Sequence, residues 1–80
     1  MSTRDRVADQ ATLFGWSITT HTRDTANYVR GDKAILIDYN RDGNINTADL
    51  YRFFRIDDLH LMERAGNRHK KEKVLAWLAS

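Results

Sequence analysis

Basic side chains crowd one short stretch of this 80-residue chain, between positions 64 and 73. That stretch opens a predicted C-terminal helix, and a helix dipole disfavours cations at its N-terminal end. An anion bound to the free amide groups there would offset this cost. The cluster is therefore a candidate phosphate contact, with a solvated face or a protein-binding face as the alternatives. Glu72 is the only acidic residue in the stretch. The basic residues of the cluster are Arg64, Arg68, His69, Lys70, Lys71 and Lys73.

The stretch AGNRHKKEKVLAWLAS, residues 65–80, loosely resembles the last helix of a double-stranded-RNA-binding domain. In that family a Lys-Lys pair at the start of the helix contacts phosphates across the major groove. The resemblance implies that Lys70 and Lys71 contact nucleic-acid backbone, assisted by Arg68 and Lys73. This chain departs from the family pattern because Lys73 stands where a small alanine is usual.

Acids and amides concentrate in the middle of the chain, where residues 38–49 read DYNRDGNINTAD. This string resembles the calcium loop of EF-hands, and more closely that of dockerin modules, which ends in aspartate. The resemblance implies a calcium site whose oxygen ligands come from Asp38, Asn40, Asp42, Asn44, Asn46 and Asp49. The same letters also suit the tip of a β-hairpin, because Asn, Asp and Gly are favoured in turns. The residues directly before the turn include Ala-Ile-Leu-Ile, which is typical of a β-strand. This favours the hairpin.

No arrangement of side chains in the sequence indicates catalysis. The three histidines are scattered and the chain has no cysteine to assist them, so we expect no zinc site. Ser17 has no evident base beside it. Asp57 and Asp58 would point to opposite faces of an extended segment and would not form an acid–base pair. We therefore expect a protein that is not an enzyme.

Both ends of the chain predict helices that would position these residues. Ser2 opens a capping box before a helix over about residues 3–14. Gly15 can adopt the positive φ that ends such a helix. Asn67 is expected to cap a final helix over about residues 68–79. The apolar side of this last helix comprises Val74, Leu75, Trp77 and Leu78.

The segment between the helices predicts a sheet, because period-two alternation and β-branched residues recur along it. The predicted strands cover residues 16–23, 27–30, 33–39 and 44–54, whereas residues 56–63 fit a strand or a helix. Pairing across the central turn would place Tyr39 opposite Ile45. The same register would place Ile37 opposite Thr47.

These elements predict one α+β domain over residues 1–80. We expect an antiparallel sheet of three to five strands with N- and C-terminal helices packed on one face, which would bury both tryptophans. The net charge of +2 is too small to indicate nucleic acid by itself. No stretch approaches transmembrane length or has the pattern of a signal peptide, so we expect a cytoplasmic protein with no membrane partner.

The chain as a whole resembles the small α+β accessory proteins encoded by actinobacteria and their phages. The resemblance rests on an N-terminal helix that ends in Gly-Trp, on Tyr-Val-Arg-Gly-Asp-Lys before a strand, and on a closing Lys-Val-Leu-Ala-Trp-Leu helix. It implies a non-enzymatic binding protein that grips a host protein or nucleic acid. Three targets stay open: nucleic-acid backbone at the basic helix, a protein or a second copy at apolar residues of the 51–62 region, and calcium at residues 38–49.

Overall fold

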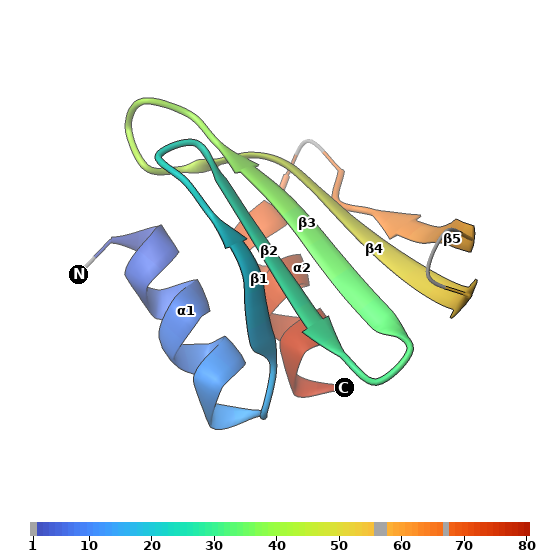
Figure 1. Ribbon diagram of the computed structural model, residues 1–80. Helices are drawn as coiled ribbons and strands as arrows, with labels where there is room; N and C mark the ends of the chain where they lie inside the picture. Colours follow the sequence, from blue (N-terminus) through green and yellow to red (C-terminus); the bar gives the residue numbers. More distant parts are fainter. Residues whose placement is uncertain (1, 56–57, 67) are drawn as a thin grey trace.

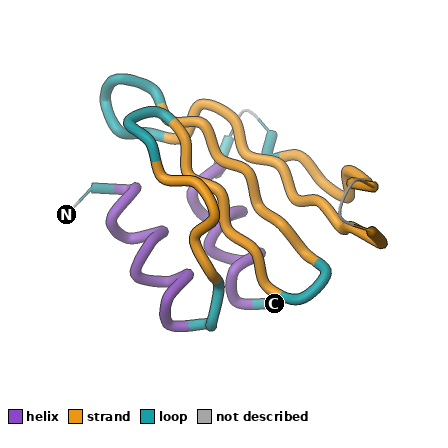
Figure 2. The backbone as a smooth tube through the Cα atoms, viewed as in Figure 1, coloured by secondary structure: helices purple, strands orange, loops and turns teal. Residues whose placement is uncertain are grey.

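The structure, a computed structural model, describes residues 2–55, 58–66 and 68–80 (Figure 1). In chain order its elements are α1 (Thr3–Leu13), β1 (Ser17–His21), β2 (Thr25–Arg30), β3 (Lys33–Tyr39), β4 (Ile45–Arg55), β5 (Asp58–Arg64) and α2 (Lys70–Ala79). The strands form one antiparallel sheet in the order β1-β2-β3-β4-β5, so each strand pairs with its neighbours in the sequence (Figure 2). The fold is therefore α+β, as the sequence predicts.

Helix α1 begins and ends at local signals in the sequence. The hydroxyl of Ser2 accepts a hydrogen bond from the amide of Asp5 at 3.1 Å, which satisfies one of the free N–H groups of the first turn. At the other end Gly15 has a φ of +81°, and the amide of Trp16 donates to the carbonyl of Ala11 at 2.9 Å. This is a Schellman ending, which delivers the chain directly into β1.

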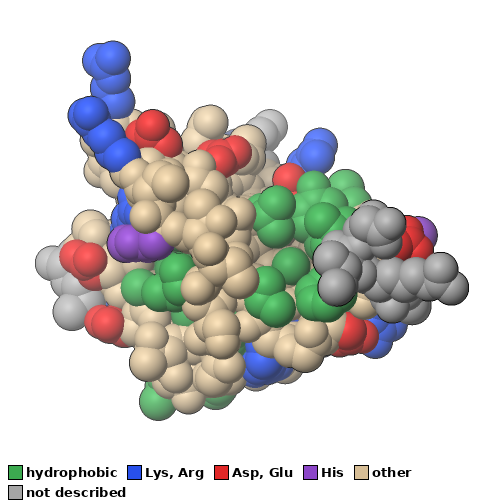
Figure 3. All heavy atoms as spheres, viewed as in Figure 1, with side chains coloured by type: hydrophobic (Ala, Val, Ile, Leu, Met, Phe, Trp, Pro, Cys, Tyr) green, Lys and Arg blue, Asp and Glu red, His purple; other side chains and the backbone are tan. Residues whose placement is uncertain are grey.

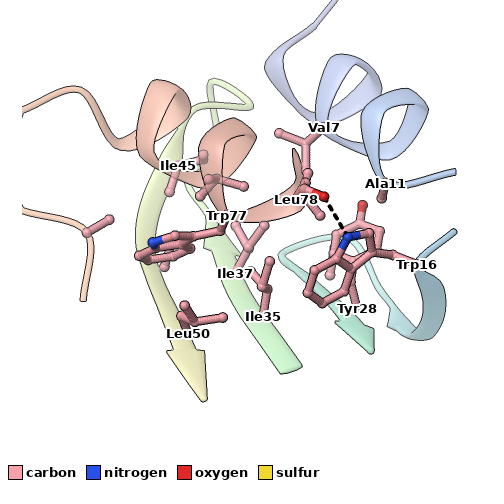
Figure 4. Packing of buried hydrophobic residues seen from close by; sticks show 14 of the residues in the cluster. Val7, Ala11, Trp16, Tyr28, Ile35, Ile37, Ile45, Leu50, Trp77 and Leu78 are labelled. Carbon is pink, nitrogen blue, oxygen red and sulfur yellow. Dashed lines mark hydrogen bonds between the residues drawn. The ribbon is translucent and has the colours of Figure 1, made fainter. Parts of the chain in front are cut away.

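Both helices lie over the same side of the sheet, which we call the covered face (Figures 1 and 4). Side chains from α1, α2 and the three central strands form one buried cluster between the two layers. The largest fully buried members of the cluster are Tyr28, Ile35, Ile37, Leu78, Val7 and Val74. The apolar residues of the two helices therefore serve to close this one face.

The two tryptophans are both buried, as expected, and each holds two elements together. Trp16 donates its indole N–H to the carbonyl of Leu78 in α2 at 2.9 Å. Trp77 donates its indole N–H to the carboxylate of Glu63 in β5 at 3.1 Å. A buried indole N–H needs such a partner, so these bonds fix where α2 sits on the sheet.

Arg30, at the end of β2, contacts the C-terminal ends of both helices. Its guanidinium donates to the carbonyl of Phe14 at 3.0 Å and to the backbone oxygen of Ser80. The same group lies 4.7 Å from the centre of the Trp16 ring. A cation favours the partial negative charge of a helix C-terminus, so Arg30 holds both helices against the sheet.

The register between β3 and β4 agrees with the prediction only near the turn. Tyr39 pairs with Ile45, as expected, but Ile37 pairs with Ala48. The predicted pairing of Ile37 with Thr47 is wrong, because a β-bulge between these positions adds one residue to β4. The shift by one residue turns Ala48 to the covered face and Thr47 to the other face.

The last third of the chain settles one open alternative and corrects one boundary. Residues 58–64 form β5 and are not helical; residues 56–57 lie outside the described part. Helix α2 begins at Lys70 after His69, two residues later than predicted, and the expected cap Asn67 lies outside the described residues. Neither helix of the described chain is long and apolar enough to cross a membrane.

Candidate binding surface

The side of the sheet opposite the helices is not covered by any described element, and we call it the open face. Directly paired residues of neighbouring strands point to the same side of a sheet. Val29 pairs with Ala34, Ala34 with Tyr51, and Tyr51 with Leu61. One apolar row therefore crosses four strands on this side. The apolar side chains of the open face are Val29, Ala34, Leu36, Tyr51, Phe53, Leu59 and Leu61.

The composition of β3 explains why both faces of the sheet are apolar. Antiparallel strands with one face in water usually alternate apolar and polar residues. Residues 34–37 instead read Ala-Ile-Leu-Ile, so Ile35 and Ile37 enter the core while Ala34 and Leu36 face the other way. The strand has the pattern of one that is buried on both sides, although helices cover only one of them.

A shallow hollow of about 390 Å³ lies in the open face between β1 and β5. Figure 3 is drawn from the open side and shows hydrophobic side chains gathered over β3, β4 and β5. Leu59 and Leu61 are each 49% exposed. A continuous exposed apolar patch of this kind marks an interaction surface more often than scattered single residues do. The hollow is lined by Thr19, Asn27, Val29, Ala34, Leu36, Phe53 and Leu59.

The charged groups of the open face lie at its margin, and each is hydrogen-bonded within the chain. Asp49 accepts a hydrogen bond from the Nε of Arg64 at 2.8 Å. Asp38 accepts from the hydroxyls of Thr25 and Thr47, at 3.1 and 3.0 Å. The pKa of Arg64 is raised by its hydrogen bond to Asp49, so the guanidinium stays charged. The open face therefore has an apolar centre and a polar edge whose charged side chains are hydrogen-bonded.

The basic cluster predicted from the sequence is partly used for holding α2 in place. Lys70 donates to the backbone oxygen of Asn46 at 2.7 Å. Lys73 forms an ion pair with Glu63. Hydrogen bonds from Lys73 and then Trp77 lower the pKa of Glu63, so the carboxylate stays ionised. These contacts tie the first turn of α2 to β4 and β5.

The remaining basic residues of the cluster lie at the N-terminus of α2, where the N-cap residue provides no side-chain hydrogen bond to the described residues. His69 occupies the N-cap position with a φ of +60°, and its side chain makes no capping hydrogen bond within the described chain. Arg68 and His69 are exposed and Lys71 is half-buried. Of the four residues predicted to contact nucleic acid, Arg68 and Lys71 are thus the two whose side chains make neither a hydrogen bond nor an ion pair with another described residue.

Residues 38–49 form a hairpin rather than a loop between helices. The side-chain oxygen of Asn40 accepts from the amides of Asp42 and Asn44, at 3.0 and 3.1 Å, and Gly43 has a φ of +81°. The flanking segments are β3 and β4, so the hairpin interpretation is confirmed.

The residues that the resemblance assigned to calcium do not converge on one point. Asp38 and Asp49 are engaged by threonines and by Arg64, while Asn40 closes the turn on itself. Asn46 is the extra residue of the β-bulge, and its backbone oxygen accepts from Lys70. Among the described residues, no group of three or more His, Cys, Asp or Glu lies where it could hold a metal ion. Calcium binding stays a prediction.

The burial of two tyrosine hydroxyls on the covered face was not predicted from the sequence. The hydroxyls of Tyr28 and Tyr39 are buried, and neither has a hydrogen-bond partner among the residues that the structure describes. Burial raises the pKa of Tyr28 and of Tyr39 above the usual value of 10.0. The guanidinium of Arg4 lies 5.2 Å from the centre of the Tyr39 ring. These groups belong to the core beneath α1.

Comparisons with known proteins add no family to this description. A scan against protein-family models and searches of curated proteins and of solved structures found no match to the chain. The resemblances to RNA-binding domains, to calcium loops and to phage accessory proteins therefore stay predictions. The open face is the feature that the structure adds to them.

Proposed function

We propose that the protein is a non-enzymatic binding protein that binds a protein partner through the open face of its sheet. The observation that carries the proposal is the apolar row from Val29 to Leu61, which spans four strands on the side without helices. Three of its neighbours on the same face, Leu36, Phe53 and Leu59, extend the row into a patch.

The chemistry of the open face favours a protein over a polyanion. Protein interfaces typically have an apolar centre with aromatic anchors and a polar rim. Tyr51 and Phe53 supply the aromatic groups, and the Asp49–Arg64 pair supplies a rim without net charge. Because these side chains stand on a sheet, little backbone freedom is lost when they are covered. We therefore expect a partner with an apolar surface and few unpaired charges.

Nucleic-acid contact at the start of α2 is the competing proposal, and the two can be separated. With Lys70 and Lys73 already bonded, Arg68 and Lys71 are the cations that remain for phosphate. Two phosphate contacts give a salt slope of only about −2, which corresponds to weak binding. Mobility shifts with a mixed-sequence duplex at low and at moderate salt would detect such contact, and Arg68→Glu with Lys71→Glu would abolish it.

A photo-crosslinking residue placed at position 61 tests the proposed function. Position 18 is the matched control, because Ile18 is also 49% exposed and lies on the other edge strand. Ile18 pairs with the buried Tyr28 and therefore faces the helix side. We expect crosslinks to protein from position 61 and none from position 18. Equal products from both positions, or none from either, would contradict the proposal.

A further inference from the structure

Resting on the proposed function, we infer that the partner of the open face is a second copy of this chain, packed open face to open face about a two-fold axis. Such an assembly is a four-layer sandwich with helices outside and two sheets inside. The inference adds the identity of the partner to a surface that the proposed function leaves general.

Charge is the first argument, because a two-fold interface brings the same patch against itself. A face of one sign would repel its copy. On the open face the described acids are Asp38 and Asp49, and the base Arg64 neutralises Asp49 at 2.8 Å. Asp38 lies about 13 Å from Ala34 along β3 and so stands outside the apolar row. The face is compatible with its own copy.

Geometry is the second argument. Two sheets of the same twist pack face to face about 10 Å apart, with strands about 30° from parallel. An axis in the interface lays the row from Val29 to Leu61 of one copy against the same row of the other. Apolar side chains then meet apolar side chains, and the Asp49–Arg64 pairs lie at the rim. The β3 pattern, apolar on both sides, is accounted for by this arrangement.

Size is the third argument, and it sets the strength of the dimer. Five strands about 4.8 Å apart present a face of about 500 Å². A standard interface buries about 800 Å² per partner, so the open face is smaller than that and has the size of a weak, transient contact. A chain of 80 residues also buries a smaller share of its surface than larger domains do, which makes an added layer favourable. We therefore expect a reversible dimer with a Kd of about 10–100 µM.

Sedimentation velocity over about 5–500 µM tests the inference, because this range brackets the expected Kd. The average mass of the wild-type chain should rise from near 9.3 kDa toward twice that value as its concentration rises. Leu59→Lys with Leu61→Lys should weaken association by at least about tenfold, since both lysines would enter an apolar interface. Ile18→Lys, equally exposed on the other face, should associate like the wild type.

The outcomes separate this inference from the proposed function. A wild type that stays monomeric throughout the range overturns the second-copy inference. If crosslinks from position 61 then lead to a different protein, the proposed function survives alone. Dimers that persist in the Leu59/Leu61 variant also overturn the inference, because they would use another surface. A monomeric chain without crosslinks from position 61 overturns both.

Discussion

The two faces of the sheet are built from the same strands and both have apolar side chains, yet they contribute to different properties. On β3, Ile37 is fully buried beneath the helices, whereas its neighbour Leu36 is partly exposed on the open face. The covered face is closed by two helices, two indole hydrogen bonds and the Arg30 contacts. Hydropathy alone therefore does not tell which side of a strand stabilises the fold and which side is free to bind.

The largest expected effect is the difference between the two faces in how much a substitution lowers the free energy of unfolding. Ile37→Ala should lower the free energy of unfolding by about 2–4 kcal/mol, because it leaves a cavity in the core. Leu36→Ala, one residue away, should cost less than about 1 kcal/mol in the monomer, since its side chain is already partly in water. Urea denaturation of both variants at low protein concentration measures the difference. Equal losses would contradict the assignment of the two faces.

High pH should weaken the covered face through its two tyrosines. Their pKa is raised by burial in the folded state, so their contribution to stability is present below about pH 10 and is lost as the pH rises further. The expected loss is up to about 1.4 kcal/mol per pH unit for each tyrosine. Denaturation curves between pH 8 and pH 11 measure it.

The matched variant for the pH experiment is the double replacement Tyr28→Phe with Tyr39→Phe. It should remove most of the alkaline loss, and at pH 7 it should be at least as stable as the wild type because the hydroxyls have no described partner. An unchanged pH profile in the variant would show that other groups control alkaline unfolding.

Arg30→Ala should have an intermediate effect, because it loosens the helices from the covered face. We expect a loss of about 1–2 kcal/mol, from the hydrogen bonds to two helix ends and the contact with Trp16. Arg6→Ala is the matched control: its side chain is exposed on α1, and its removal should change stability by less than about 0.5 kcal/mol. Thermal unfolding followed by circular dichroism compares the two variants.

The smallest effect on folding is expected on the open face itself. Leu59→Lys with Leu61→Lys should change the free energy of unfolding by less than about 0.5 kcal/mol at low concentration, since both side chains are half in water. Guanidinium denaturation checks this value. A loss of several kcal/mol would place these leucines in the core and remove them from any binding surface.

Much of the fold could be predicted because its signals are local. Ser2 and Gly15 mark the ends of α1, and the Asn-Arg-Asp-Gly turn marks the hairpin after β3. The β-bulge in β4 could not be predicted, because it depends on which residues the two helices bury. The Arg30 contacts could not be predicted either, since Phe14 and Ser80 lie 16 and 50 residues away in the sequence.

The candidate site was predicted only in part, for a related reason. The apolar alternation of Leu59 and Leu61 was visible, but residues 56–63 fitted two kinds of element, so the face they share was undetermined. The lysines of α2 illustrate the opposite case. Their charge is evident in the sequence, whereas the bonds of Lys70 to Asn46 and of Lys73 to Glu63 depend on tertiary contacts.

The most direct test that a second copy of the chain binds the open face is a dilution series followed by amide chemical shifts. Between about 500 µM and about 20 µM the fraction of chains in dimers falls about 1.5- to 3-fold for the expected Kd. We expect concentration-dependent shifts at Val29, Leu36, Tyr51 and Leu61, with the amides of α1 and α2 unchanged. Shifts confined to the start of α2, or none at any position, would contradict the account.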